Sequence, residues 1–204
     1  MIAIIDYGSG NLAAIANIYK QLKIPHIVTR DAQELAKADR YILPGVGAFD
    51  ATMRNLNDSG MVAILQEQII RQGKKVMGIC VGMQILAESS EEGELAGLGW
   101  IPGRVRKIDA SRLTNGPRLP HMGWNSIQPR TELSIFRGVD VERGFYFLHS
   151  YYFDAANDEH ILATVNYGND IPCSVKRDNV SGMQFHPEKS HANGVAVYRN
   201  FAEL

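Results

Sequence analysis

Short apolar runs alternate with segments of helical periodicity through the first half of the chain. Four runs are predicted to form strands, at residues 2–5, 26–29, 41–43 and 75–78. Pro44 and Gly45 are expected to end the third strand. Apolar residues at helical spacing predict helices at 12–19, 61–69 and 81–87, and Asp31 with Glu34 resembles a capping box at the start of another. Strands that alternate with helices in this way predict a parallel sheet covered by helices on both faces.

The second half has a different pattern, because turns but no clear helices separate its apolar segments. The predicted strands are residues 104–108, 145–153, 161–167, 171–176 and 180–185. This succession predicts antiparallel extensions of the sheet, and a helix at 193–202 would end the chain. We therefore predict a single α/β domain over residues 1–204, with a mixed, mostly parallel central sheet flanked by helices.

Composition and charge are those of an ordinary globular protein and exclude several classes of function. Hydrophobic residues make up 45% and charged residues 21% of the chain, and the formal net charge is −1. Without an excess of basic residues, no bulk attraction to nucleic acid or to an anionic membrane is expected. The sequence shows neither a secretory leader pattern nor an apolar run near the roughly 20 residues that span a bilayer. We therefore expect a cytoplasmic protein.

Only two cysteines occur, Cys80 and Cys173, which excludes a disulfide framework and a four-cysteine zinc site. Cys80 lies in Gly78-Ile79-Cys80-Val81-Gly82, between a predicted strand and a predicted helix. This is the context of a nucleophile elbow with cysteine in place of serine, where the glycines allow a strained turn. The alternative is a buried structural cysteine beside two packing glycines. Cys173 lies in an alternating strand and is expected to be a small packing residue of that kind.

A thiol nucleophile needs a base that later acts as an acid, and His186 is the candidate. It follows a predicted strand in Gln184-Phe185-His186-Pro187-Glu188, so we expect it at a sheet edge, as we do for Cys80. Glu188, two residues further on, could orient the imidazole as the third member of a triad. Taken alone, a His-Pro-Glu segment is more often a surface loop, so its weight comes from its combination with the elbow.

Backbone N–H groups near the elbow could stabilise a negatively charged oxygen. The N–H of Val81 directly follows the nucleophile, and Gly45, Val46 and Gly47 form a turn after another predicted strand. A phosphate-binding turn or a plain loop is the alternative for residues 45–47. Neither G-x-G-x-x-G nor a Walker A sequence is present, which disfavours nucleotide binding.

His121 and His149 are the other histidines that could suggest a special site. No acidic or thiol residues lie near them at the spacing of metal ligands. We therefore expect core or interface histidines, and neither a metal nor a cofactor.

These motifs together resemble the class I glutamine amidotransferases, which use a Cys-His-Glu triad. The segment from Gly78 to Gln84 resembles their nucleophile motif, and His186-Pro187-Glu188 resembles their histidine and glutamate. The resemblance implies a flavodoxin-like fold and hydrolysis of L-glutamine to L-glutamate and ammonia through a thioester on Cys80. It also implies that Gln84, Ser150 and Tyr151 hold the α-amino and carboxylate groups of glutamine.

Longer stretches are similar to one branch of that family, the glutaminase subunits of imidazole glycerol phosphate synthases. These stretches are residues 5–11, 44–49, 120–125, 146–151 and 184–190. The similarity implies a heterodimer in which ammonia passes through a channel to a (β/α)8-barrel cyclase subunit. That subunit would make imidazole glycerol phosphate and AICAR in histidine biosynthesis. The similarity also places Asn11, Trp124, Tyr146 and Lys189 at or near the shared surface, although core aromatics and a solvated lysine are the ordinary alternatives.

Other functions remain open at this point. A paralogous glutaminase could serve another acceptor, such as a surface-polysaccharide sugar, and a catalytically silent subunit could only bind a partner. A cysteine hydrolase of other amides or peptides is disfavoured by Gln84, Ser150 and Tyr151. We further expect slow turnover by the isolated subunit, because residues 45–47 would reach oxyanion geometry only when the partner binds its own substrate.

Overall fold

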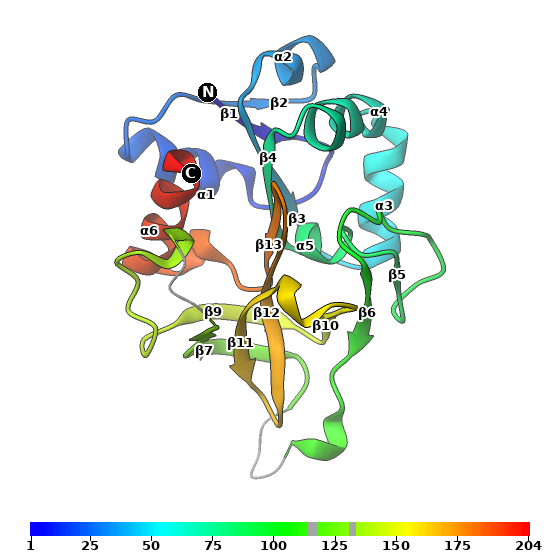
Figure 1. Ribbon diagram of the computed structural model, residues 1–204, viewed down its shortest axis with the longest axis vertical. Coiled ribbons are helices and arrows are strands. Elements are labelled where there is room, and N and C mark those ends of the chain that lie inside the picture. The colour runs from blue at the N-terminus through cyan, green and yellow to red at the C-terminus, as the bar shows by residue number, and fades with distance from the viewer. Residues whose placement is uncertain (114–117, 131–133) are drawn as a thin grey trace.

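The computed structural model describes residues 1–113, 118–130 and 134–204. A central sheet runs through the molecule, with helices α1 (Leu12–Gln21) and α6 (His191–Glu203) on one side and α3 (Phe49–Asp58) and α4 (Val62–Leu65) on the other (Figure 1). Two smaller sheets lie toward one end. The prediction of a mixed, mostly parallel sheet flanked by helices is confirmed.

The central sheet contains eight strands within the described part of the chain. In spatial order they are β2 (His26–Thr29), β1 (Ile2–Ile5), β3 (Arg40–Gly45), β4 (Lys75–Cys80), β13 (Val180–Met183), β12 (Asp170–Arg177), β11 (Ile161–Asn166) and β8 (Gln128–Pro129). The first five are parallel, and the last three alternate in direction. Because Met183 pairs with Ile79, the carboxyl ends of β13 and β4 meet at the same edge of the sheet.

The strands at the centre of this sheet are buried along nearly their whole length. Every residue of β1 is buried, and in β3 and β4 only the first residue is partly exposed. Such strands read as continuous apolar runs because helices cover both faces of the sheet. This is the reason that the predicted bounds of β1 are those of the structure.

The remaining helical segments are short. They are α2 (Ala32–Lys37), α5 (Val81–Gln84), the π-helical turn η1 (Gln66–Arg71) that continues α4, and the 3-10 turns η2 (Ala110–Arg112), η3 (Ser134–Phe136), η4 (Asp158–His160) and η5 (Pro187–Lys189). The Asp31 side chain accepts a 2.7 Å hydrogen bond from the N–H of Gln33 and caps α2. Glu34 bonds Lys37, so the predicted capping box is only half formed.

The prediction that Pro44 and Gly45 end the third strand is wrong. β3 runs through both residues and pairs with β4 as far as Gly45 and Cys80. On its other side, β3 pairs with β1 only up to Ile42, and the Pro44 carbonyl accepts a hydrogen bond from the Tyr7 hydroxyl. The missing N–H of proline therefore falls where no neighbouring strand needs a donor.

Two helices also differ from the prediction. The helix expected at 81–87 is a single turn that ends at Gln84. Helix α3 was not predicted, although its buried side chains have helical spacing: Phe49, Thr52, Met53 and Leu56. The sequence shows the spacing of these residues, but the adjacent glycine-rich turn favours a loop.

The second half is more divided than predicted. The expected strand at 145–153 is two strands, β9 (Phe145–His149) and β10 (Tyr151–Ala155), which separate at Ser150 and enter different sheets. β9 pairs with β7 (His121–Asn125), while β10 pairs with β6 (Gly103–Lys107), which also pairs with β5 (Ser89–Ser90). Only β12, β11 and β8 form the predicted antiparallel extension, because β13 is parallel to β4.

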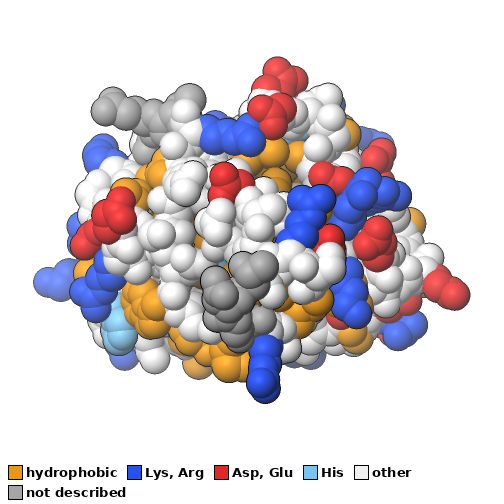
Figure 2. Space-filling view, turned by 90° about the horizontal axis from the view of Figure 1, so that it is seen from below, with side chains coloured by type: hydrophobic (Ala, Val, Ile, Leu, Met, Phe, Trp, Pro, Cys, Tyr) orange, Lys and Arg blue, Asp and Glu red, His pale blue; other side chains and the backbone are white. Residues whose placement is uncertain are grey.

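Figure 2 shows the end of the molecule toward which β7, β11 and β12 lie. Basic and acidic side chains are interspersed on this face, with small apolar patches between them. Among the described residues, no helix has the length and apolar character needed to cross a membrane.

Candidate active site

Cys80 lies on a strained turn between β4 and α5. Its backbone has φ 55° and ψ −113°, a conformation that residues other than glycine rarely adopt. Strain of this kind costs about 1–3 kcal/mol and persists only where the surroundings enforce it. The turn places Cys80 at the carboxyl edge of the sheet, where it is 4% exposed. Because α5 is one turn long, its dipole contributes little to this position.

The glycines of the elbow are required by close backbone packing. A Cβ atom on Gly78 would lie 2.4 Å from the carbonyl oxygen of Gly82, and one on Gly82 would lie 1.9 Å from that of Leu43. A Cβ atom on Gly45 would lie 2.4 Å from the Gly82 nitrogen. β3, β4 and α5 therefore meet at three positions where only glycine fits, which explains the G-x-C-x-G pattern around Cys80.

His186 and Glu188 follow β13, the strand beside β4. The Nδ1 atom of His186 lies 2.8 Å from Oε1 of Glu188, and the side chains are only 4% and 2% exposed. Burial alone would lower the pKa of His186, but the hydrogen bonds to Cys80 and Glu188, with the charges of both, raise this pKa to about 10. With Nδ1 occupied by the carboxylate, Nε2 is the imidazole atom that remains for the sulfur of Cys80.

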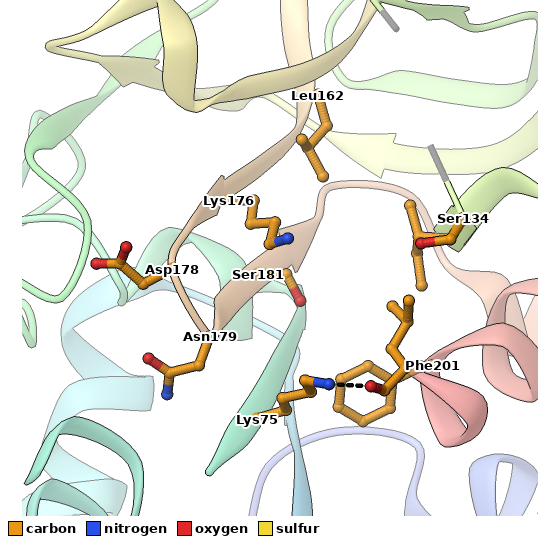
Figure 3. Close-up of a pocket in the computed structure, with 10 residues that line it drawn as sticks. Lys75, Ser134, Leu162, Lys176, Asp178, Asn179, Ser181 and Phe201 are labelled. Carbon is orange, nitrogen blue, oxygen red and sulfur yellow. Dashed lines mark hydrogen bonds between the residues drawn. The ribbon is translucent and has the colours of Figure 1, made fainter. Parts of the chain in front are cut away.

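Cys80 and His186 line one cleft of about 360 Å³. Its described lining also contains most of the other predicted site residues: Val46, Gly47, Val81, Gln84, Ser150, Tyr151 and Lys189. A hollow at the opposite edge of the sheet, where Lys75 bonds the Leu204 carbonyl, has about 120 Å³ (Figure 3). None of the predicted site residues lines that hollow.

Gln84 is held inside the protein next to the nucleophile. Its Nε2 atom donates to the carbonyl of Tyr151 at 3.1 Å and to Oε1 of Gln184 at 3.0 Å. The amide of Gln184 in turn approaches the sulfur of Cys80 at 3.8 Å. Both hydrogens of the Gln84 amide are thereby used, so Oε1 of Gln84 is the atom left to contact a ligand.

The turn after β3 is bound to another loop. The N–H of Val46 donates to the Ser9 hydroxyl at 3.0 Å, and that hydroxyl donates to the Val46 carbonyl at 3.2 Å. Val46 itself is 47% exposed, and Gly47 has φ 97° with nothing within 4 Å of an added Cβ. In this conformation the Val46 N–H is therefore committed to Ser9 and does not point freely into the cleft.

Three of the four predicted interface residues lie together. Trp124 on β7 pairs in register with Tyr146 on β9, and Nζ of Lys189 lies 5.6 Å from the centre of the Tyr146 ring. Trp124 is 41% exposed and stacks on His191 at 5.5 Å. Asn11 is exposed at the start of α1, on another element.

Sequence reasoning missed Glu92, Ser9 and the cleft wall formed by Leu148 and His149. Glu92 lines the cleft and accepts a 2.8 Å hydrogen bond from the N–H of Phe49 at the start of α3. Ser9, Leu148 and His149 lie in the similar stretches 5–11 and 146–151, which do not by themselves assign them a role at the cleft, and no motif contains Glu92. Their roles depend on contacts between distant segments. Cys173 is fully buried, as predicted, and burial raises the pKa of its thiol. In the described part of the chain, no three His, Cys, Asp or Glu side chains are grouped to hold a metal ion.

Comparison with known proteins places this cleft in a family. The sequence profile of "Glutamine amidotransferase class-I" matches residues 3–203. The chain belongs to the class I glutamine amidotransferase family. This confirms the family resemblance and the enzyme class predicted from the motifs.

Two similar proteins match the chain over its full length. The protein of Bdellovibrio bacteriovorus named "Imidazole glycerol phosphate synthase subunit HisH" is 51% identical over 204 residues, with 100% of both chains covered. The protein of the same name from Leptospira borgpetersenii is 47% identical, again over 100% of both chains.

Solved structures support the amidotransferase fold. A crystal structure titled as a glutamine amidotransferase aligns with a TM-score of 0.72 at 18% identity, covering 99% of this chain and 97% of the other. The structure of PurLQS from Thermotoga maritima aligns with a TM-score of 0.67 at 17% identity, with 99% and 97% covered. At such low identities these likenesses concern the fold alone.

Proposed function

We propose that this chain is the glutaminase subunit of imidazole glycerol phosphate synthase, working with a partner subunit in histidine biosynthesis. The observation that carries the proposal is that Cys80 and His186 line one cleft, with Glu188 bound to His186, in a chain about half identical to relatives of that name over their full length. We propose that residues 1–204 form one amidotransferase domain, which the family match over residues 3–203 supports. Two free, buried cysteines suit a reducing cytoplasm.

The proposed reaction has two halves. The proton of the Cys80 thiol lies on His186, whose pKa is raised to about 10, and the sulfur of Cys80 bonds to the side-chain amide carbon of glutamine. His186 then gives a proton to the amide nitrogen, the C–N bond breaks, ammonia leaves and a glutamyl thioester remains. Water activated by His186 attacks the thioester, which releases glutamate and restores the thiol. Glu188 holds the imidazole throughout, with Nδ1 toward its carboxylate.

The tetrahedral oxygen needs backbone donors, for which we propose the N–H of Val81 and the turn at Gly45, Val46 and Gly47. The hydrogen bond from Val46 to Ser9 supports a regulated site, because this donor must leave Ser9 before it can serve an oxyanion. We propose that docking of the loaded partner subunit releases it. Glutamine hydrolysis by the isolated chain is then slow.

The free end of glutamine carries an ammonium and a carboxylate, and both need partners. We propose that Gln84, Ser150 and Tyr151 bind these groups, since all three line the cleft beside Cys80. Glu92 is the sole acidic side chain in the described lining of the cleft, so we propose it as the partner of the α-ammonium group.

For the partner subunit we propose a (β/α)8-barrel cyclase that receives ammonia through a channel and makes imidazole glycerol phosphate and AICAR. Support comes from the patch of Trp124, Tyr146 and Lys189, which lies beside His186 because Lys189 is part of η5 and also lines the cleft. An exposed tryptophan within a patch of this kind is typical of interfaces. We add Asn11 to the interface on the sequence similarity alone.

Steady-state glutamine hydrolysis with and without the cognate synthase subunit tests the proposal. We expect hydrolysis in the complex, little in the isolated chain, and none with Cys80→Ala. The matched control is Cys173→Ala, which should keep the activity of the complex. A glutamine-analogue electrophile should label Cys80 and leave Cys173 unlabelled. Equal inactivity of the wild-type complex and Cys80→Ala would point to a silent subunit and overturn the proposal.

A further inference from the structure

At the cleft wall, two buried histidines face each other across β7 and β9. His121 and His149 are a directly paired cross-strand couple, 3% and 6% exposed. Nδ1 of His121 lies 2.9 Å from Nε2 of His149. Burial lowers the pKa of His121 to about 4, and burial with the neighbouring His121 lowers the pKa of His149 to about 3. Both rings are therefore neutral at pH 7, and each carries one ring proton.

The hydrogen-bond partners specify where those protons lie. Nδ1 of His149 is 2.8 Å from the carbonyl oxygen of Tyr151, which can only accept, so Nδ1 carries the proton. Nε2 of His149 is then the acceptor, and Nδ1 of His121 must donate to it. Nε2 of His121 accepts in turn from the Asn125 amide at 3.2 Å, whose second hydrogen goes to the Asn166 carbonyl at 3.0 Å. Each donor in this chain meets one acceptor.

The chain of hydrogen bonds ends at the cleft wall. The Tyr151 carbonyl that accepts from His149 also accepts from Nε2 of Gln84 at 3.1 Å. The position of the Tyr151 carbonyl therefore depends on two donors, His149 and Gln84. His149, Tyr151 and Gln84 all line the cleft, whereas His121 does not belong to the described lining.

We infer that His121 is a positioning residue for glutamine binding: its Nδ1–H keeps His149 in the tautomer that holds the Tyr151 carbonyl against Gln84. Without that donor, His149 could carry its proton on Nε2, and the lone pair of Nδ1 would then face the lone pairs of the Tyr151 carbonyl. The peptide at Tyr151 would move, and Gln84 would lose its anchor. This inference rests on the proposed function of the cleft.

The competing role for His121 is packing alone. Its ring is stacked between Phe147, at 4.6 Å and 19° between planes, and Tyr167, at 4.0 Å and 24°. Two substitutions at this position separate packing from hydrogen bonding. His121→Phe keeps an aromatic ring in the stack and removes the donor. His121→Asn removes the ring but can place an amide N–H near the position of Nδ1.

The test uses the full chain assembled with the synthase subunit, and glutamine hydrolysis as the kinetic readout. We expect His121→Phe to raise the KM for glutamine about tenfold, as for the loss of one hydrogen bond, with a smaller change in kcat. His121→Asn should stay within about threefold of the wild-type KM. Equal KM values for His121→Phe and wild type, or a larger defect in His121→Asn than in His121→Phe, would overturn the inference.

A second readout does not require turnover. In the isolated chain with 15N-labelled histidine, NMR should show His149 protonated on Nδ1 in the wild type and a change of tautomer in His121→Phe. A wild-type His149 protonated on Nε2 would overturn the inference, whatever the chain hydrolyses. If His121→Phe does not fold, His121→Asn is compared with His121→Ala, and equal KM values for these two would count against the role of the donor. Absence of hydrolysis by the wild-type complex would instead refute the proposed function.

Discussion

Two neighbouring parts of the cleft around Cys80 differ in packing. The elbow from Gly78 to Gly82, here called the rigid wall, is packed against backbone, whereas the turn at Val46 and Gly47, here called the open wall, has room to spare. A Cβ atom on Gly82 would lie 1.9 Å from the Leu43 carbonyl, but one on Gly47 would meet nothing within 4 Å. Cys80 is 4% exposed on the first wall, and Val46 is 47% exposed on the second. Glycines on both walls are predicted from the sequence to matter for catalysis. Close backbone packing requires Gly82, whereas no contact requires Gly47.

The difference indicates which catalytic groups the isolated chain positions without its partner subunit: the Cys80 sulfur, but not the N–H groups of the turn after β3. The elbow is enforced by contacts among β3, β4 and α5, so the position of the sulfur does not depend on a partner. The turn after β3 is held by a pair of hydrogen bonds between Ser9 and Val46, which can exchange for others at small cost. We therefore expect substitutions on the first wall to damage folding or chemistry outright, and substitutions on the second to change its regulation.

The largest effect should come from Cys80→Ala. Loss of the nucleophile should lower kcat for glutamine hydrolysis in the complex by about four orders of magnitude or more. The unfolding free energy should fall modestly at neutral pH, because alanine leaves the backbone strain in place and removes the sulfur that helps to hold the charge on His186. Residual activity within tenfold of wild type would show that the rigid wall does not carry the chemistry. Steady-state kinetics and urea unfolding measure the two quantities.

The paired substitutions Gly82→Ala and Gly47→Ala test the comparison directly. Gly82→Ala forces a methyl group into the Leu43 carbonyl and should cost more than about 3 kcal/mol of unfolding free energy, or prevent folding. Gly47→Ala meets no atom, and its φ of 97° should cost about 1 kcal/mol or slightly more. Urea unfolding of both variants gives the answer. Similar losses from the two would contradict the distinction between the walls.

The pH dependence of stability should report the ion pair of His186 and Glu188, which follows β13 beside the elbow. The pKa of His186 is raised to about 10, so its contribution is complete below its unfolded value near 6.5 and is lost as the pH rises toward 10. Glu188→Gln removes one of the partners that raise this pKa. The unfolding free energy of wild type should therefore fall more steeply between pH 7 and pH 10 than that of Glu188→Gln. Parallel curves would mean that Glu188 does not set the charge of His186.

The smallest expected effect is that of Ser9→Ala on the open wall. Removing the hydroxyl frees the Val46 N–H, so hydrolysis by the chain without its partner should rise about two- to fivefold, in line with one weak hydrogen bond. Hydrolysis in the complex should stay near the wild-type rate. A lower rate without the partner would show that Ser9 supports the active conformation instead of restraining it.

Prediction from sequence was correct where the local sequence of one segment is enough to decide its structure. β1 and β2 have the predicted bounds, and the elbow lies between a strand and a helix as its glycines indicated. It failed where a neighbour changed the outcome. β3 continues through Pro44 because no strand needs its donor there, and the apolar stretch at 145–153 divides at Ser150 because its two halves pair with different strands. The hydrophobic pattern of a segment does not show which strand it will pair with.

Residue types and their spacing are enough to define the chemistry: a cysteine between glycines, a histidine with a glutamate two residues later, and an alternation of elements that places both at one sheet edge. Those features are local, since they depend on side-chain type, on the space a glycine leaves and on periodicity. Which hydrogen-bonding groups remain available to a ligand follows from the packing of the folded chain. The Val46 N–H bonds a hydroxyl 37 positions away, and His121 bonds a histidine 28 positions away. A hydrogen-bonding group takes whichever partner the packed chain brings within reach, and that choice exists only after folding.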